Sequence, residues 1–195
     1  LGMPLNQSKD QETLSDSHLY WLECNYPNVK RLKADLSETY AKLMTDLTKE
    51  FTLEYTGNPM AKANTKSRLR MVTLYHVAAN VNGIVVGTGN KVEDYGVGFY
   101  TKYGDGGVDI APIADLYKSE VWELGEYLEV DQRIVDAQPT DGLWDDSRTD
   151  EAQLGASYPE LEEAMETGKG PGVEVLNKFN TLNKHKMEPI PTFKL

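Results

Sequence analysis

Residues 84–91 read Ile-Val-Val-Gly-Thr-Gly-Asn-Lys, and this stretch decides the predicted fold class. Its first three residues form a short β-branched run without polar alternation, a pattern typical of a strand buried on both faces of a parallel sheet. The glycines that follow permit a tight turn at the carboxyl end of that strand, where open α/β sheets bind their ligands. The stretch therefore predicts an α/β unit that ends in a binding loop.

Helical patterns flank the predicted strand. Before it, residues 35–51 and 64–80 repeat apolar side chains at the three- and four-residue spacing of amphipathic helices. After it, Asp115 and Ser157 have the side chains of helix N-caps. Residues 1–5 alternate apolar and other side chains, which predicts the end of a further strand. The chain is therefore expected to combine short strands with many helices.

Composition limits the class of protein. The chain has 195 residues, 39% hydrophobic and 26% charged, so a single domain over residues 1–195 is expected. Its net charge of −11 disfavours a nucleic-acid partner, and its single cysteine, Cys24, excludes an internal disulfide or a thiolate metal site. No window reaches the roughly 18 apolar residues of a membrane helix, and residues 1–4 lack the features of a signal peptide. We therefore expect a cytoplasmic protein without membrane contact.

A glycine-rich loop follows the predicted strand. Seven of the 21 residues from Gly87 to Gly107 are glycine, more than ordinary turns need, so a binding element is expected. Within it, the Thr88 hydroxyl and the Lys91 ammonium are suited to the ring nitrogen or phosphate of a nucleotide. A plain glycine turn after a strand explains the same residues, and the local sequence leaves both interpretations open.

Two carboxylates, Glu93 and Asp94, lie within reach of the same strand end. Mg²⁺ beside bound phosphates typically uses one or two carboxylates and several waters, so one of them is a candidate metal ligand. The alternative is that both are solvated loop charges.

Residues 99–109 read Phe-Tyr-Thr-Lys-Tyr-Gly-Asp-Gly-Gly-Val-Asp and concentrate aromatic, cationic and acidic side chains. Such a mixture suits a planar ring stacked beside ribose hydroxyls or phosphate, but a tight hairpin turning at Asp105-Gly106 uses the same residues. Downstream, Lys118 falls in the first turn of the helix expected after Asp115, where a lysine opposes the helix dipole unless an anion is near. A surface lysine with its head in water is the other interpretation.

Taken in chain order, seven segments resemble the ammonia-using NAD synthetase family, and the likeness extends over nearly the whole chain. The segments are Ser67-Arg68-Leu69-Arg70-Met71, residues 87–94, residues 99–109, Pro112 through Lys118, Pro139-Thr140-Asp141-Gly142-Leu143-Trp144, Thr149-Asp150-Glu151 and His185-Lys186. The resemblance implies an adenine nucleotide alpha hydrolase-like (Rossmann-like) α/β fold, with an open, mostly parallel sheet and helices on both faces. It also implies a homodimer.

The resemblance further implies a ligase of NAD biosynthesis that makes NAD from deamido-NAD, ATP and ammonia, with Mg²⁺ as cofactor. The nicotinate carboxylate would attack the α-phosphorus of ATP and release pyrophosphate, and ammonia would then attack the adenylate and release AMP. A free carboxylate is a poor acyl donor, so coupling it to AMP supplies the leaving group that it lacks. Cations offset the charge on the transferring phosphorus.

Residue by residue, the resemblance implies three sets of contacts. ATP is assigned to Thr88, Lys118 and Thr140, and Mg²⁺ to Glu93. Deamido-NAD is assigned to Asn64, Arg68, Lys102, Asp109, His185 and Lys186. No residue is assigned a catalytic role.

The chain also departs from the family pattern. The family's phosphate-binding string, Ser-Gly-Gly-x-Asp-Ser, does not occur in the 195 residues, so a strand, loop and helix N-terminal to them are expected to complete the site. Val92 replaces a small polar residue beside Glu93. No amidohydrolase domain with a nucleophilic cysteine is present in the sequence, so free ammonia is the expected nitrogen donor.

Two alternatives follow. A non-catalytic nucleotide-binding fragment of the same fold would bind its ligands without turnover. The second alternative is another type of ATP pyrophosphatase, which would amidate a different acceptor. Residues 102–109 and the His185-Lys186 pair favour deamido-NAD over such an acceptor.

Overall fold

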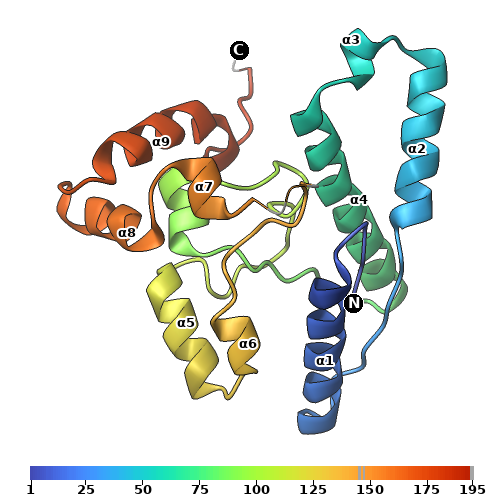
Figure 1. The fold of residues 1–195 in the computed structure, drawn as a ribbon, viewed down its shortest axis with the longest axis horizontal. Coiled ribbons are helices and arrows are strands. Elements are labelled where there is room, and N and C mark those ends of the chain that lie inside the picture. The colour runs from blue at the N-terminus through green and yellow to red at the C-terminus, as the bar shows by residue number, and fades with distance from the viewer. Residues whose placement is uncertain (145, 147, 194–195) are drawn as a thin grey trace.

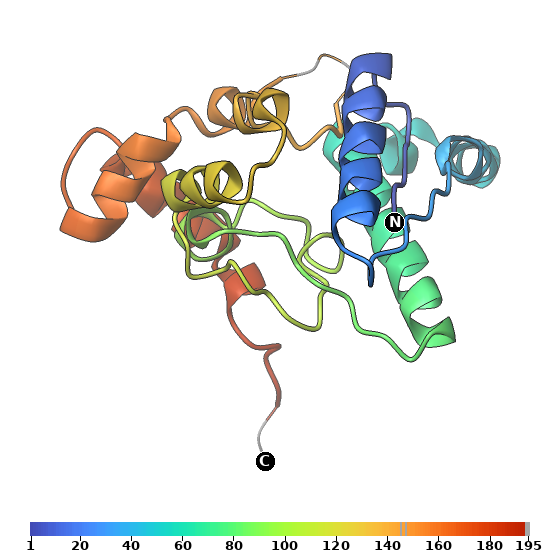
Figure 2. The same cartoon turned by 90° about the horizontal axis from the view of Figure 1, so that it is seen from below.

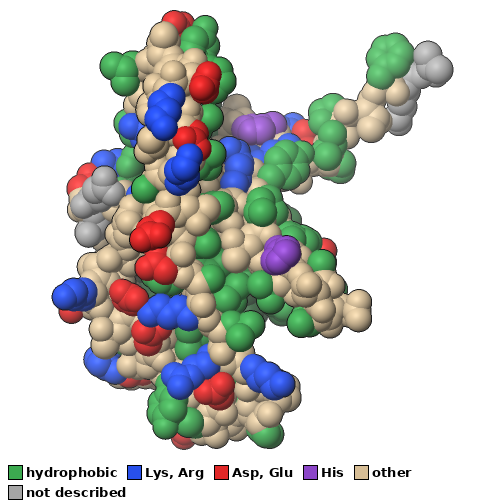
Figure 3. Space-filling model, turned by 90° about the vertical axis from the view of Figure 1, so that its right-hand side faces the viewer, with side chains coloured by type: hydrophobic (Ala, Val, Ile, Leu, Met, Phe, Trp, Pro, Cys, Tyr) green, Lys and Arg blue, Asp and Glu red, His purple; other side chains and the backbone are tan. Residues whose placement is uncertain are grey.

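The helices fall into two groups in the computed structural model, which describes residues 1–144, 146 and 148–193 (Figure 1). The first group consists of α1 (Lys9–Asn25), α2 (Ser37–Glu50), α3 (Leu53–Thr56) and α4 (Pro59–Asn80). The second consists of a single π-helical turn, η1 (Val92–Val97), with α5 (Lys118–Tyr127), α6 (Gln132–Val135), α7 (Asp150–Leu154), α8 (Tyr158–Thr167) and α9 (Val173–Met187). Beyond α9, the C-terminal tail stands clear of the body (Figures 2 and 3).

Each group has its own apolar core. In the first, Leu5, Leu36 and Tyr40 are buried, so the N-terminal residues pack against the start of α2. In the second, η1 packs against α8 and α9. The buried side chains of this second core are Val92, Val97, Leu154, Tyr158 and Leu161. In the part of the chain that the structure describes, no helix is long and apolar enough to cross a membrane.

The predicted parallel sheet is wrong for the described residues, where only two isolated parallel bridges occur, Gly2 with Lys33 and Val86 with Ile110. The sequence predicts burial of residues 84–86 on both faces, but only Val85 is buried, while Ile84 is 60% and Val86 52% exposed. The reason is that this segment pairs with only one other described segment, around Ile110. Gly87 N donates to Ile110 O at 2.7 Å. Without a second neighbour and covering helices, alternate side chains face outward.

Several predicted helix boundaries shift. The helix predicted over 64–80 begins at Pro59, because the Asn58 side chain caps it by accepting from Met60 N and Ala61 N. Asp115 does not cap α5, whose N-cap is Tyr117; the Asp115 carboxylate instead pairs with Lys91 at 3.2 Å. The Ser157 cap is confirmed, with a complete capping box to Glu160 at the start of α8.

The segment 99–109 does not form a hairpin. Gly104 N donates to Thr101 O at 2.8 Å and Gly107 N donates to Gly104 O at 2.9 Å, so the chain coils through successive turns. A Cβ on Gly104 would lie 2.2 Å from the Ser67 hydroxyl of α4, so only glycine permits this close approach. These turns bring residues 99–105 against α4.

Candidate functional site

A cavity of about 400 Å³ opens between α4, residues 98–105, residues 141–144 and the end of α9. It brings together five of the six residues assigned to deamido-NAD by resemblance: Asn64, Arg68, Lys102, His185 and Lys186. Phe99, Tyr100, Trp144 and Phe179 supply aromatic surface to the same cavity. Segments far apart in the sequence therefore meet at one concave site.

Backbone carbonyls hold the cations of this cavity. Lys186 donates from Nζ to the carbonyl oxygens of Gly98 and Tyr100, both at 2.8 Å, and Arg68 donates from Nε and Nη2 to the Lys102 carbonyl at 3.3 and 3.2 Å. Lys102 in turn donates from Nζ to the His185 carbonyl. Burial lowers the pKa of Lys186 from its ordinary value.

Arg68, Lys102 and Lys186 have no carboxylate partner within ion-pair distance among the described residues. Their side chains are held by neutral carbonyl acceptors, while Asp105 and Asp141 also line the cavity and the Asp105 charge partly opposes the effect of burial on the pKa of Lys186. A ligand that carries phosphate or carboxylate groups would give these cations a direct anionic partner through charge-assisted hydrogen bonds. The cavity is therefore suited to an anionic ligand with a planar ring.

Asp105 shapes one wall of the cavity, a role that the sequence does not reveal. Its Oδ1 accepts from the Ser67 hydroxyl at 2.6 Å and from Thr101 N at 3.1 Å. Thr101 donates from its own hydroxyl to Asn64 Oδ1 at 2.7 Å. This chain of bonds ties residues 101–105 to α4 and fixes the side of the cavity that carries Asn64.

Asp109, the sixth residue assigned to deamido-NAD, does not line this cavity. Its Oδ2 accepts from Val85 N at 2.7 Å and its Oδ1 accepts from the Tyr75 hydroxyl at 3.1 Å. The carboxylate thus joins residues 84–86 to α4, which is a structural task.

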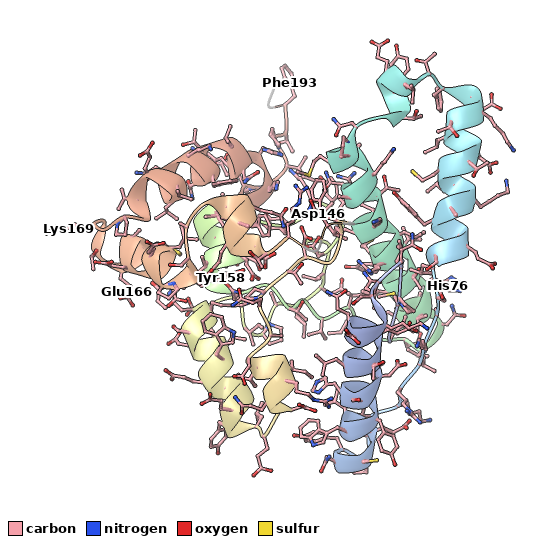
Figure 4. All side chains as sticks on the ribbon, in the orientation of Figure 1. His76, Asp146, Tyr158, Glu166, Lys169 and Phe193 are labelled. Atoms are coloured by element: carbon pink, nitrogen blue, oxygen red, sulfur yellow. The ribbon has the colours of Figure 1, made fainter. Side chains whose placement is uncertain are left out.

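A second site is centred on Glu93, in the first turn of η1. Glu93 Oε1 accepts from Lys118 Nζ at 3.1 Å and from the Tyr158 hydroxyl at 2.8 Å. The side chains of Glu93 and Lys118 are only 17% and 18% exposed, so this ion pair is shielded from water. Tyr158 is fully buried within the second group of helices (Figure 4).

Asp150 completes this network. Its Oδ2 lies 3.2 Å from the Tyr158 hydroxyl, and its Oδ1 is buried without a hydrogen-bond partner in the described part of the chain. Burial, reinforced by the nearby Glu93 charge, raises the pKa of Asp150 to about 6. Burial likewise raises the pKa of Tyr158. Local sequence carries no signal for either role, because both depend on contacts between distant segments.

The three residues assigned to ATP do not share one cavity. Lys118 belongs to the Glu93 network. Thr140 lines a smaller cavity of about 240 Å³ beside Gln7 and Trp144, and its hydroxyl donates to Arg148 O at 3.0 Å. Thr88 is exposed on the loop after residues 84–86 and lines neither cavity.

Glu93 fits a magnesium ligand, although no group of three or more metal-binding side chains occurs among the residues that the structure describes. Its Oε1 is anchored twice, whereas its Oε2 accepts only one long bond of 3.4 Å from Asn90 N. That hard carboxylate oxygen can therefore still accept a cation, and Mg²⁺ needs few protein ligands when phosphates and waters supply the rest.

Comparisons relate this chain to known proteins. The family model described as NAD synthase matches residues 1–193. A protein named NH(3)-dependent NAD(+) synthetase from Carboxydothermus hydrogenoformans is 39% identical over 83% of this chain, which spans 66% of that protein's length. One of the same name from Alkaliphilus metalliredigens is 36% identical over 98% of this chain and 78% of its own length.

Among solved structures, the NMN synthetase of Francisella tularensis superposes with a TM-score of 0.83 and 33% identity, over 99% of this chain and 77% of that one. The arrangement of the described helices therefore matches an established fold, although the parallel sheet is reduced here to two bridges.

Proposed function

Because the chain belongs to the NAD synthase family, we propose that it serves the ATP-dependent amidation of deamido-NAD by ammonia, with release of AMP and pyrophosphate. The observation that carries this proposal is the cavity between α4 and α9, in which Arg68, Lys102 and Lys186 have no acidic partner among the described residues. Deamido-NAD combines a pyrophosphate, a pyridine carboxylate and planar rings, which are the groups that this cavity is suited to bind.

In this proposal the chain's residues bind and orient the reactants. The three cations hold the anionic dinucleotide, and the aromatic side chains of the cavity take its ring, which places the nicotinate carboxylate for attack. Lys118, fixed by Glu93, offers a cation to the ATP phosphates and stabilises charge on the transferring phosphorus. When bound at Glu93, Mg²⁺ would neutralise phosphate charge.

Two parts of the proposal rest on the family likeness alone. The active protein is proposed to be a homodimer. The Ser-Gly-Gly-x-Asp-Ser string that the likeness implies is absent from the 195 residues, and we propose that residues outside them supply it in the active protein.

A second candidate acceptor is nicotinate mononucleotide. It is favoured by the likeness to a protein titled NMN synthetase, which extends over 99% of this chain at a TM-score of 0.83. The chemistry at the carboxylate would be the same, and only the adenylate half of the acceptor would be missing.

The test is product analysis with both acceptors. The protein is incubated with Mg²⁺, ATP, ¹⁵N-ammonia and either deamido-NAD or nicotinate mononucleotide, and the products are separated and identified by mass spectrometry. We expect ¹⁵N-labelled NAD with equal amounts of AMP and pyrophosphate. Labelled NMN as the preferred product would establish the second acceptor, and nucleotide binding without any labelled product would establish the non-catalytic alternative.

A further inference from the structure

Tyr158 is a fully buried tyrosine whose hydroxyl lies among charged groups. The residue is 0% exposed, its ring packs edge-on against Trp122 at 6.2 Å between centroids, and it begins α8 directly after the Ser157 cap. The ring is therefore fixed by packing on all sides, and its hydroxyl has one available place. That place is 2.8 Å from Glu93 Oε1 and 3.2 Å from Asp150 Oδ2.

The hydroxyl has a single proton, so it can donate to only one of these two carboxylates. The shorter distance favours donation to Glu93 Oε1. Lys118 donates to the same oxygen, and its ammonium also lies 5.0 Å from the centroid of the Tyr158 ring. Tyr158 thus contacts both members of the Glu93–Lys118 ion pair.

Two hydrogen bonds to one oxygen of a carboxylate fix the direction in which its second oxygen points. With Oε1 held by Tyr158 and Lys118, rotation of the Glu93 carboxylate is prevented, and Oε2 keeps only its long bond to Asn90 N. We propose that Tyr158 is a positioning residue that holds Glu93 so that Oε2 is presented to the divalent cation. This inference rests on the proposed function, in which Glu93 binds that cation.

The test is direct binding of Mn²⁺, used as a paramagnetic probe for Mg²⁺, in the presence of a non-hydrolysable ATP analogue. Free Mn²⁺ is measured by electron paramagnetic resonance for the wild type, Tyr158→Phe and Glu93→Gln. We expect Tyr158→Phe to raise the Mn²⁺ dissociation constant about tenfold, within the range that loss of an outer-shell partner typically gives, and Glu93→Gln to raise it further.

Tyr95→Phe is the matched control. Tyr95 lies on η1 two residues after Glu93, is 60% exposed, and its hydroxyl makes no hydrogen bond to the described residues. Loss of the Tyr95 hydroxyl should leave the Mn²⁺ dissociation constant unchanged. If product formation is also followed, Tyr158→Phe should raise the magnesium concentration for half-maximal rate while the KM for deamido-NAD stays the same, a split that a general loss of structure would not give.

Unchanged Mn²⁺ affinity in Tyr158→Phe, together with weakened affinity in Glu93→Gln, would overturn the positioning role and leave the proposed function intact. Unchanged affinity in both variants would overturn the metal role of Glu93 and the positioning role with it. Should Tyr158→Phe fail to fold because the buried Asp150 carboxylate then lies beside an apolar ring, the double variant Tyr158→Phe/Asp150→Leu places apolar groups at both positions, and the same outcomes apply.

Discussion

Lys118 occupies the first turn of α5, where its charge opposes the helix dipole. The sequence leaves two interpretations open, a nearby anion or a solvated surface lysine, and in the structure the Glu93 carboxylate lies 3.1 Å from Lys118. Because the pair is shielded from water, each charge depends on the other, and removal of one leaves the other buried and unpaired. A single substitution here therefore affects both proposed contacts, to ATP and to Mg²⁺.

We expect Lys118→Ala to raise the KM for ATP at least tenfold, because a shielded charge-assisted contact to phosphate is worth roughly 1.5–3 kcal/mol. The KM for deamido-NAD should change little, since Lys118 does not line that cavity. Steady-state kinetics with each substrate varied in turn measures both constants. Lys169→Ala, in the exposed turn after α8, is the control (Figure 4). An ATP dependence of Lys118→Ala equal to that of the wild type would refute the role of Lys118.

Asp150 makes stability depend on pH. Its pKa is raised from 3.8 to about 6 in the folded protein, so between these values the folded state binds a proton that the unfolded state has already lost. That contribution is complete below about pH 4 and is lost as the pH rises through about 6. We expect Asp150→Asn to be more stable than the wild type at pH 7.5 by about 1–2 kcal/mol, and equally stable near pH 4.

Urea denaturation across this pH range measures the difference. Asp10→Asn is the control, because Asp10 is also acidic in a first helical turn but is exposed on α1. A constant difference between Asp150→Asn and the wild type at every pH would contradict the raised pKa.

For single residues, the sequence predicts which side chains belong to the ligand-binding site better than it predicts their hydrogen-bond partners. The family likeness supplies Asn64, Arg68, Lys102, His185 and Lys186, which the fold gathers at one cavity. It does not reveal Tyr158 or Asp150 beside Glu93, because hydrogen bonds between residues 65 positions apart leave no local pattern. It also groups Asp109 with the ligand contacts, and that assignment stays a prediction; in the structure the Asp109 carboxylate accepts from Val85 N and the Tyr75 hydroxyl.

Among the elements, η1 and α9 form the closest pairing, and glycine makes it possible. Gly98 ends η1 with φ of +62°, and a Cβ there would lie 2.6 Å from Asn183 Cβ of α9. Asn183 also donates from Nδ2 to Val97 O at 2.8 Å, which closes the end of η1. His185 and Lys186 follow Asn183 on α9, so this contact positions the side of the deamido-NAD cavity that these two residues form.

Gly98→Ala should therefore lower the free energy of unfolding by about 2–4 kcal/mol, through backbone strain and the clash with α9 together. Gly168→Ala is the matched control. Gly168 has φ of +67°, but a Cβ there would meet no described atom within 4 Å, so this variant should lose only the strain, roughly 1–2 kcal/mol. Chemical denaturation measures both, and equal losses would show that the η1–α9 contact is not tightly packed.

Capping chemistry explains which elements are predictable. The Ser157–Glu160 box is local, so the start of α8 follows from the sequence alone. Helix α1 has a local N-cap, Ser8, whose side chain accepts from Gln11 N, but none of its residues is buried and its apolar side chains do not form one continuous face. The apolar run at residues 84–86 predicts a larger sheet than the described part of the structure contains, because such a run does not reveal how many neighbouring strands a strand has.

The molecule as a whole carries a net charge of −11, yet the cavity between α4 and α9 holds three cations, Arg68, Lys102 and Lys186, with no carboxylate within ion-pair distance among the described residues. Two cores, one in each group of helices, support the opposite walls of that cavity. The first group also exposes apolar side chains around α3, where Leu53 is 80% and Tyr55 72% exposed. Phe51, 52% exposed, packs edge-on against Tyr55, and exposed apolar side chains that cluster in this way are typical of a subunit contact.

For the proposed homodimer we accordingly expect a sedimentation mass twice that of the chain, and a shift towards the monomer in Leu53→Asp/Tyr55→Asp, because two buried charges would oppose association. Analytical ultracentrifugation measures both masses. Tyr127→Asp, an exposed tyrosine at the end of α5, is the control and should leave the dimer intact. A wild-type protein that sediments as a monomer at every concentration would contradict the proposal.

The cavity between α4 and α9 is proposed to bind the dinucleotide, and the rest of the proposed function depends on it. The decisive quantity is the dissociation constant of deamido-NAD, measured by calorimetry for the wild type, Lys102→Met and a control, Lys62→Met, on the exposed side of α4. We predict that Lys102→Met weakens binding about tenfold or more while Lys62→Met leaves it unchanged. Equal affinity in all three proteins would show that the dinucleotide binds elsewhere.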